Sequence, residues 1–230
     1  MRSAVLGTGA VGQALAAKLV ALGHDVAVAT RDPQATLART DPDALGNPPF
    51  NVWCQAHPDV ELTTPPQATA QAELIVNATN GAGSLAMLEL AGEENLSGKL
   101  LIDIANPLDF SHGMPPSLFV SNTDSLGEQI QRRFPQARVV KALNTMNCEV
   151  MVDPGKVPGE HDVFLCGDDP DAKRQATELL QRFGWPAARI IDLGAISSAR
   201  GTEMYVALWL RLWGALGTGH FNIAVVRAEA

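Results

Sequence analysis

The sequence predicts an α/β fold in which helices cover both faces of a doubly wound parallel sheet, followed by a small C-terminal α/β extension. Three observations support this fold class. Short apolar runs alternate with helical patterns through the first half of the chain. A glycine-rich turn joins the first apolar run to the first helical pattern. The 230 residues are 46% hydrophobic and 18% charged, a composition typical of a chain that buries a core.

Strands that are buried on both faces read as short, continuously apolar runs. Such runs occur at residues 3–6 and 25–29, each after one polar first residue, and at residues 74–76 and 100–102, and another begins at residue 139. The first helix is predicted over residues 12–22, where leucines recur at helical spacing and Gly23 supplies a C-terminal stop. The alternation of strands and helices indicates parallel pairing.

Prolines interrupt this pattern twice. Residues 33–66 are predicted to form a loop-rich excursion with room for one short helix, and residues 106–116 form a second loop. Thr123 or Asp124 is then expected to cap a helix that ends at Pro135.

The last 80 or so residues have their own pattern. Asp169 is placed as an N-cap and Gly184 as a stop, which predicts a helix over residues 170–183. Short strands are expected on either side of it, at residues 163–166 and 190–191.

A long apolar helix is predicted over residues 198–214. One stripe of it should be buried, and it consists of Met204, Leu208, Trp209, Leu212 and Trp213. Because so apolar a helix is hard to cover within one small domain, we expect it to form the contact of a homodimer.

Charge and cysteine content exclude several classes of function. The formal net charge is −8, so a nucleic-acid-binding protein is not expected, because phosphate binding needs a basic field. The three cysteines (Cys54, Cys148, Cys166) form no CxxC pair, which favours a reducing cytoplasmic location. The apolar run before Gly7 is too short for a signal peptide, and Arg211 interrupts the longest apolar stretch.

The glycine-rich turn carries the clearest functional signal. Residues 7–12 have the pattern GxGxxG, directly after a strand and at the start of a helix. Its members, all candidate cofactor-binding residues, are Gly7, Thr8, Gly9, Ala10, Val11 and Gly12. In a Rossmann-type dinucleotide-binding unit these glycines permit a tight turn, admit the pyrophosphate and let helix and strand pack closely. We therefore place such a domain at residues 1–148, followed by a small C-terminal domain at residues 149–230.

The end of the second strand selects the nucleotide. An NAD site usually carries an Asp or Glu there, whereas this strand ends in Thr30 and Arg31. A hydroxyl and a guanidinium suit a 2′-phosphate, which favours NADP. The alternative is that Asp32 takes the NAD role.

Acid–base and metal chemistry are not indicated. Tyr205 has no lysine four residues later, and the five histidines are isolated, so neither a Tyr–Lys pair nor a zinc site is predicted. Hydride transfer between two conjugated carriers needs mainly orientation, so we expect direct transfer without a general acid.

Four segments in order carry a family resemblance: the N-terminal motif with Thr30 and Arg31, and residues 139–146, 166–169 and 191–200. Together they resemble the coenzyme F420-dependent NADP reductase family, whose nucleotide domain is similar to that of the STEAP ferric reductases. The resemblance implies that NADP lies across the sheet edge, with the deazaflavin in a cleft between the domains.

The resemblance also implies further site residues. Ala78, Thr79, Asn106 and Pro107 would line the cofactor, and Asn144, Thr145 and Met146 would lie on the substrate side, beside the reacting rings. Where the family's archaeal members carry a histidine, as we align them, this chain has Asn144, so a flavin or an organic or ferric acceptor stays open beside F420.

Two other functions remain open from the sequence. One is an imine or ketone reductase related to pyrroline-carboxylate reductase, which shares the nucleotide domain. The other is a non-catalytic NADP-sensing protein. Catalysed oxidation of NADPH would exclude the sensor.

Overall fold

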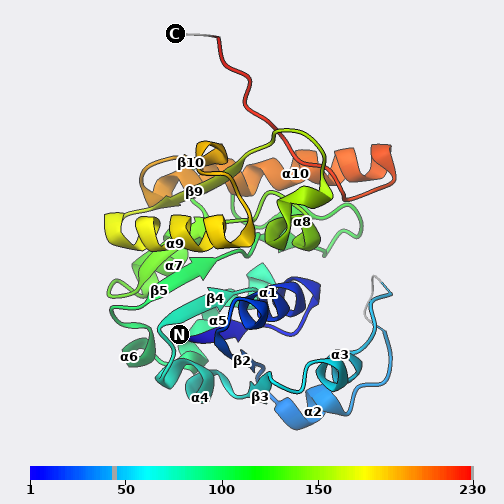
Figure 1. Cartoon of the computed structure of the whole chain (residues 1–230), viewed down its shortest axis with the longest axis vertical. Helices are drawn as coiled ribbons and strands as arrows, with labels where there is room; N and C mark the ends of the chain where they lie inside the picture. Colours follow the sequence, from blue (N-terminus) through cyan, green and yellow to red (C-terminus); the bar gives the residue numbers. More distant parts are fainter. Residues whose placement is uncertain (43–45, 229–230) are drawn as a thin grey trace.

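A computed structural model describes residues 1–42 and 46–228 of the chain (Figure 1). Its centre is an eight-stranded sheet. The strands are β1 (Arg2–Leu6), β2 (Asp25–Ala29), β3 (Glu61–Thr63), β4 (Leu74–Asn77), β5 (Leu100–Asp103), β8 (Arg138–Ala142), β9 (Val163–Gly167) and β10 (Ile190–Asp192). They lie in the order β10-β9-β8-β5-β4-β1-β2-β3, and every pair is parallel except β8 with β9. The strand order reverses between β1 and β4, where open α/β sheets bind ligands.

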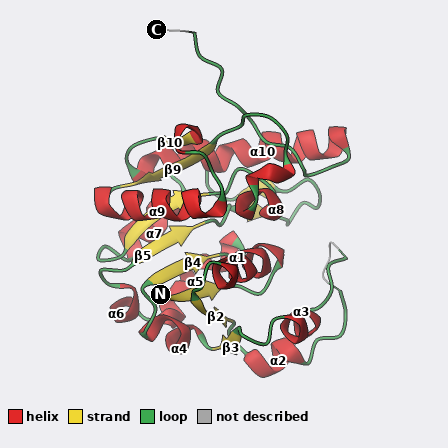
Figure 2. Ribbon diagram, in the orientation of Figure 1, coloured by secondary structure: helices red, strands yellow, loops and turns green. Residues whose placement is uncertain are grey.

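Helices cover both faces of the sheet (Figure 2). They are α1 (Ala10–Ala21), α2 (Pro33–Leu37), α3 (Phe50–Ala56), α4 (Pro65–Ala70), α5 (Gly81–Ala91), α6 (Glu93–Leu96), α7 (Leu126–Arg133), α8 (Cys148–Val152), α9 (Pro170–Phe183) and α10 (Ala199–Leu216). Successive strand residues point to opposite faces, so Val5 joins the core under α1, α8 and α9, while Ala4 and Leu6 join the core under α4 to α7. The predicted Rossmann-type fold class is confirmed.

Elements with strong local signals lie where the sequence predicts them. Strand β2 and helix α9 have the predicted bounds. Asp169 caps α9 by accepting a hydrogen bond from the Ala172 N–H at 2.7 Å, and Gly184 ends it in a left-handed conformation.

The predicted cap of α7 is wrong. Ser125 caps this helix, and its hydroxyl accepts from the Glu128 N–H at 3.1 Å. Asp124 instead binds the Arg132 guanidinium with both carboxylate oxygens, at 2.8 and 2.9 Å. The Arg132 guanidinium, in the last turn of α7, thus holds the Asp124 carboxylate and leaves the cap to Ser125.

The excursion over residues 33–66 holds more structure than predicted. It contains two helices, α2 and α3, and strand β3, which extends the sheet by pairing with β2. Residues 43–45 of this prediction lie outside the described residues. The second predicted loop contains β6 (Leu108–Asp109), which pairs with β7 (Ser117–Leu118) in a separate two-stranded sheet.

The buried face of α10 differs from the predicted stripe. Met204 and Leu208 are 39% and 54% exposed. The buried side chains are instead Ala199, Thr202, Glu203 and Val206. Glu203 pairs with a lysine inside the protein, and this buried carboxylate sets the rotation of the helix about its own axis.

The chain continues in the same sheet beyond residue 148. Strands β9 and β10 extend the sheet from β8, and one hydrophobic cluster contains side chains from both sides of the boundary. The division into residues 1–148 and 149–230 stays a proposal. It concerns function: we propose that residues 149–230 form one wall of the substrate-binding cavity. Within the described ranges, no helix is long and apolar enough to span a membrane.

His24 makes the stability of this fold sensitive to acid. The ring is buried, with Nδ1 2.8 Å from the Ser3 hydroxyl and Nε2 3.0 Å from an Arg182 nitrogen. Since arginine only donates, Nε2 accepts and the ring is neutral. Burial first, and then the chain's N-terminus and Arg182, lower the pKa of His24 from its ordinary 6.5.

The unfolded chain therefore binds this proton more readily than the folded one. We expect the free energy of unfolding to fall as the pH drops below about 6.5 and to be retained above that value. Denaturant unfolding of the wild type and of His24→Gln from about pH 5 to pH 8 measures this. A variant that keeps the wild-type slope against pH would contradict the assignment to His24.

Candidate functional site

Two adjoining hollows lie at the carboxyl ends of the parallel strands. The first, here called the glycine-side groove, has a volume of about 1070 Å³ and is lined by the glycine-rich turn and the end of β2. The second, here called the aromatic cavity, has a volume of about 850 Å³. Gln13, Ala78, Thr79 and Asn80 line both, so the two form one continuous trough.

Each glycine of the turn meets a different steric demand. Gly7 has a φ of +119°, and a Cβ there would lie 2.5 Å from the Ala78 carbonyl oxygen. A Cβ on Gly12 would lie 2.1 Å from the Gly7 carbonyl oxygen, because α1 packs tightly against the turn. Gly9, in contrast, has nothing within 4 Å of the position of a Cβ. This bare backbone at the start of α1, which carries no acidic residue in its first turn, fits the pyrophosphate of a dinucleotide.

The end of β2 presents a cation to the groove. Arg31 is exposed and lines the groove, and within residues 1–42 and 46–228 no partner holds its guanidinium. The Thr30 hydroxyl lies 3.0 Å from the hydroxyl of Thr36. Asp32 turns the other way, because its carboxylate caps α2 by accepting from the Ala35 N–H at 2.9 Å. Asp32 is therefore engaged in the local backbone, which favours Arg31 as the group that meets the nucleotide.

The groove also has a cation that sequence reasoning missed. Arg39 lines it just beyond α2. The motif spacing did not select this residue, because it lies in the excursion over residues 33–66, where only one short helix was expected and no site residue was placed beyond Asp32.

Tryptophans form the walls of the aromatic cavity. Three of the four in the chain line it: Trp53 on α3, and Trp209 and Trp213 on α10. Trp53 is stacked on His57, with ring centroids 4.0 Å apart. The ring centroids of Trp209 and Trp213 lie 5.6 Å apart. Sequence analysis did not select Trp53, because no periodicity within residues 33–66 placed a helix at this position.

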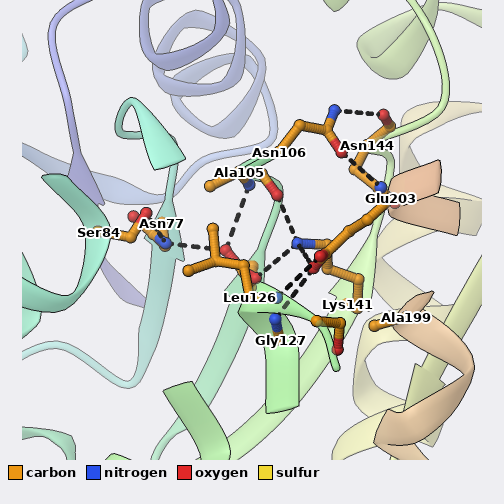
Figure 3. A network of polar contacts seen from close by, with 12 residues as sticks. Asn77, Ser84, Ala105, Asn106, Leu126, Gly127, Lys141, Asn144, Ala199 and Glu203 are labelled. Atoms are coloured by element: carbon orange, nitrogen blue, oxygen red, sulfur yellow. Dashed lines mark hydrogen bonds and ion pairs between the residues drawn. The ribbon is translucent and has the colours of Figure 1, made fainter. Parts of the chain in front are cut away.

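Two asparagines hold the floor of the aromatic cavity. The Asn144 side-chain amide donates to the Asn106 side-chain oxygen at 2.9 Å, and the Asn106 amide donates to the Asn144 carbonyl at 2.8 Å (Figure 3). The pair joins the loops after β5 and β8. Leu143, just before Asn144, has a φ of +64°, an uncommon conformation for a leucine that functional sites often hold.

Other predicted site residues are distributed along the trough. Ala10, Val11 and Met146 line the aromatic cavity, and Thr8 lines the groove. Thr145 and Pro107 are buried beside the trough but do not line it.

A buried ion cluster supports this floor from behind. The Lys141 ammonium is fully buried, 2.8 Å from Asp103 and 2.7 Å from Glu203, and it also donates to the Ala105 carbonyl (Figure 3). Burial opposes the charged ammonium, but the two carboxylates outweigh it and raise the pKa of Lys141. The remaining Glu203 bonds go to the N–H groups of residues 126 and 127, at 2.8 and 3.0 Å. The cluster thus joins β5, β8, α7 and α10.

Glu149 is the acidic group on the cavity wall. It lines the aromatic cavity and accepts from His220 at 3.1 Å. Burial first, and then Glu149, raise the pKa of the neighbouring Cys148 thiol. The described ranges contain no group of three or more His, Cys, Asp or Glu side chains placed to hold a metal ion.

Comparisons with known proteins agree with this geometry. The family model described as NADP oxidoreductase coenzyme F420-dependent matches residues 2–107. The crystal structure of a candidate F420-dependent NADP reductase from Arthrobacter sp. FB24 is 56% identical, with a TM-score of 0.92 over 99% of this chain and 100% of that one. F420-dependent NADP reductase from Methanothermobacter marburgensis is 26% identical over 92% of each chain.

More distant similarities reach other reductases. Metalloreductase STEAP3 from Rattus norvegicus is 27% identical over 91% of this chain, which spans only 37% of that protein. An imine reductase from Streptomyces aurantiacus shares the fold, with a TM-score of 0.62 at 18% identity, over 93% of this chain and 62% of that one.

Proposed function

Because this chain belongs to the family of F420-dependent NADP oxidoreductases and is an NADP-dependent reductase, we propose that it transfers a hydride between NADP(H) and a deazaflavin or flavin-type ring. One observation carries the proposal: the glycine-side groove opens directly into a cavity with three tryptophans on its walls. A dinucleotide that follows the trough would bring its reactive end to a space suited to a second planar ring.

We assign the residues of the trough by their place along it. The turn over residues 7–12 binds the pyrophosphate, and Thr30 and Arg31 bind the 2′-phosphate. Ala78, Thr79 and Asn106 follow the cofactor toward the cavity, with Pro107 supporting them. On the substrate side, Asn144 and Met146 face the rings, and Thr145 packs behind them.

NADPH supplies the hydride when it is bound. The protein's own residues orient and enclose the two partners: the asparagine pair fixes the floor, and the tryptophans exclude water from the sides. The Asn106 and Asn144 amides can hydrogen-bond a ring carbonyl but do not titrate. We therefore infer direct transfer without a general acid.

The deciding experiment is NADPH oxidation with F420, FMN and a ferric chelate in parallel. The proposal expects the highest kcat/KM with one of the two ring acceptors. A ferric chelate turned over faster than either ring, or turnover of a cyclic imine added as a fourth acceptor when the other three are inert, would replace the proposed substrate class. No oxidation with any of these would leave the NADP sensor as the function.

Replacing Trp53 tests the cavity wall. We expect Trp53→Ala to raise KM for the ring acceptor about threefold to tenfold, because an aromatic pair contributes about 0.5–1.5 kcal/mol. Trp53→Phe, which keeps a ring, should restore most of the loss. Affinity for NADPH should change little, since the adenosine end lies in the groove. An unchanged KM in Trp53→Ala would remove Trp53 from the acceptor site.

We also propose a homodimer and a cytoplasmic location. The exposed side chains Met204, Leu208 and Leu216 form an unpaired apolar face on α10, which a second copy would cover. The free thiols Cys54, Cys148 and Cys166 suit a reducing compartment.

A substitution at Leu208 tests dimerisation without altering the candidate site, because Leu208 does not line the cavity whereas Trp213 does. We expect Leu208→Glu to sediment as a monomer at micromolar concentration, and Leu208→Met to behave as the wild type. A monomeric wild type would refute the dimer.

A further inference from the structure

A chain of hydrogen bonds runs from the buried Lys141 ammonium to the Thr79 hydroxyl, at the junction of the groove and the aromatic cavity. Lys141 contacts one oxygen of Asp103 at 2.8 Å, and the other oxygen accepts from the Asn77 amide at 2.8 Å. The Asn77 side-chain oxygen accepts from the Thr79 hydroxyl at 2.6 Å. Every member except Thr79 is fully buried. No water molecule can therefore replace a partner in the chain, and each donor must face the acceptor beside it.

The orientation of the Asn77 amide is fixed from both sides. The Asp103 oxygen that faces it also accepts from the Ala105 N–H at 3.2 Å and belongs to a carboxylate paired with Lys141, so it only accepts. Asn77 must therefore turn its NH₂ group to Asp103 (Figure 3). At its other end lies the backbone N–H of Thr79, 3.4 Å away, which only donates and so requires the Asn77 oxygen.

This orientation also fixes the proton of Thr79. Its hydroxyl donates to the Asn77 oxygen, so it has no proton left to give. Ser84 receives an N–H of Asn77 at 3.1 Å, and its own hydroxyl lies 2.8 Å from Thr79, to which it donates. Thr79 consequently offers the trough only an acceptor lone pair.

We propose that Thr79 is a specificity-determining residue that accepts a hydrogen bond from the nicotinamide–ribose half of NADP(H). This inference rests on the proposed function for its cofactor. Thr79 lines both hollows, between the glycine-rich turn and the aromatic cavity, just as ribose and nicotinamide follow the pyrophosphate along the cofactor. That half carries two kinds of donor, the ribose hydroxyls and the carboxamide NH₂.

Thr79→Val removes the hydroxyl, together with its bonds to Asn77 and Ser84, with almost no change of shape. The Kd for NADPH should rise about threefold to tenfold, the effect of one net hydrogen bond. The Kd for 2′,5′-ADP, which lacks the nicotinamide half, should stay unchanged and shows that the groove is intact. Thr79→Ser should restore NADPH binding. Thr177→Val is the matched control, because that hydroxyl bonds the Lys173 carbonyl on α9, away from the trough.

The 3-acetylpyridine analogue of NADP distinguishes the two donors, because it replaces the carboxamide NH₂ by a methyl group and keeps the ribose. A Thr79→Val penalty that persists with the analogue assigns the ribose hydroxyl, and one that disappears assigns the carboxamide. An unchanged Kd for NADPH in Thr79→Val, or an equal loss for 2′,5′-ADP, overturns the inference. Failure of the wild type to bind NADPH would instead refute the proposed function.

Discussion

Replacing Lys141 with methionine is expected to lower the free energy of unfolding by about 3–5 kcal/mol, the cost of breaking a buried ion pair from one side. The substitution leaves the carboxylates of Asp103 and Glu203 inside the protein without their cation. Urea unfolding followed by far-UV circular dichroism measures the change. Because the two carboxylates raise the pKa of Lys141 above its ordinary 10.5, its contribution is fully present at neutral pH and is lost only in alkali, as the pH rises through the folded pKa.

A double-mutant cycle separates the ion cluster from simple loss of packing. Glu203→Gln keeps the shape of the side chain and removes one of the two buried negative charges. Combined with Lys141→Met, it should cost clearly less than the sum of the single changes, because both act on the same cluster. Strictly additive losses would show that the three side chains are not coupled.

The second large effect is expected at the nucleotide end of the trough. Arg31→Ala should weaken NADPH binding about tenfold to a hundredfold, because a hydrogen bond to a charged phosphate contributes about 1.5–3 kcal/mol. NADH carries no 2′-phosphate, so its affinity should change little. Titration of both nucleotides against the variant measures the difference.

Two further variants help to interpret the result for Arg31: one is a control and the other tests the second arginine of the groove. Arg174→Ala removes a guanidinium of α9 that pairs with Glu178, and it should leave both affinities unchanged. Arg39→Ala tests whether the second arginine of the groove shares the phosphate. Equal losses of NADPH and NADH affinity in Arg31→Ala would remove the assignment of the 2′-phosphate to this residue.

The parts of the fold that could be predicted are those with local causes. Strand β2 is apolar after its first residue, Asp25, and α9 has an N-cap and a left-handed glycine at its ends, so both were predictable from neighbouring residues. Strand β3 has three residues and no apolar run. It forms because β2 offers an open edge, which is information from elsewhere in the chain.

The candidate site likewise has parts that local sequence explains and parts that depend on distant residues. The glycine-rich turn and Arg31 follow from a motif with a steric and electrostatic cause. The rotation of α10 does not, because it depends on the pairing of Glu203 with Lys141, which lies 62 positions earlier in the sequence. A single lysine within an apolar strand, with an acidic residue ending the neighbouring strand, was the one available signal for the buried cluster.

The three tryptophans of the aromatic cavity come from α3 and α10, whereas the glycine-rich turn and the end of β2 line the glycine-side groove. These two helices lie at the periphery of the sheet order, one after β2 and the other after β10. Under the proposed function, substitutions at these tryptophans would therefore change the fit of the acceptor ring while leaving the glycine-rich turn and Arg31 as they are.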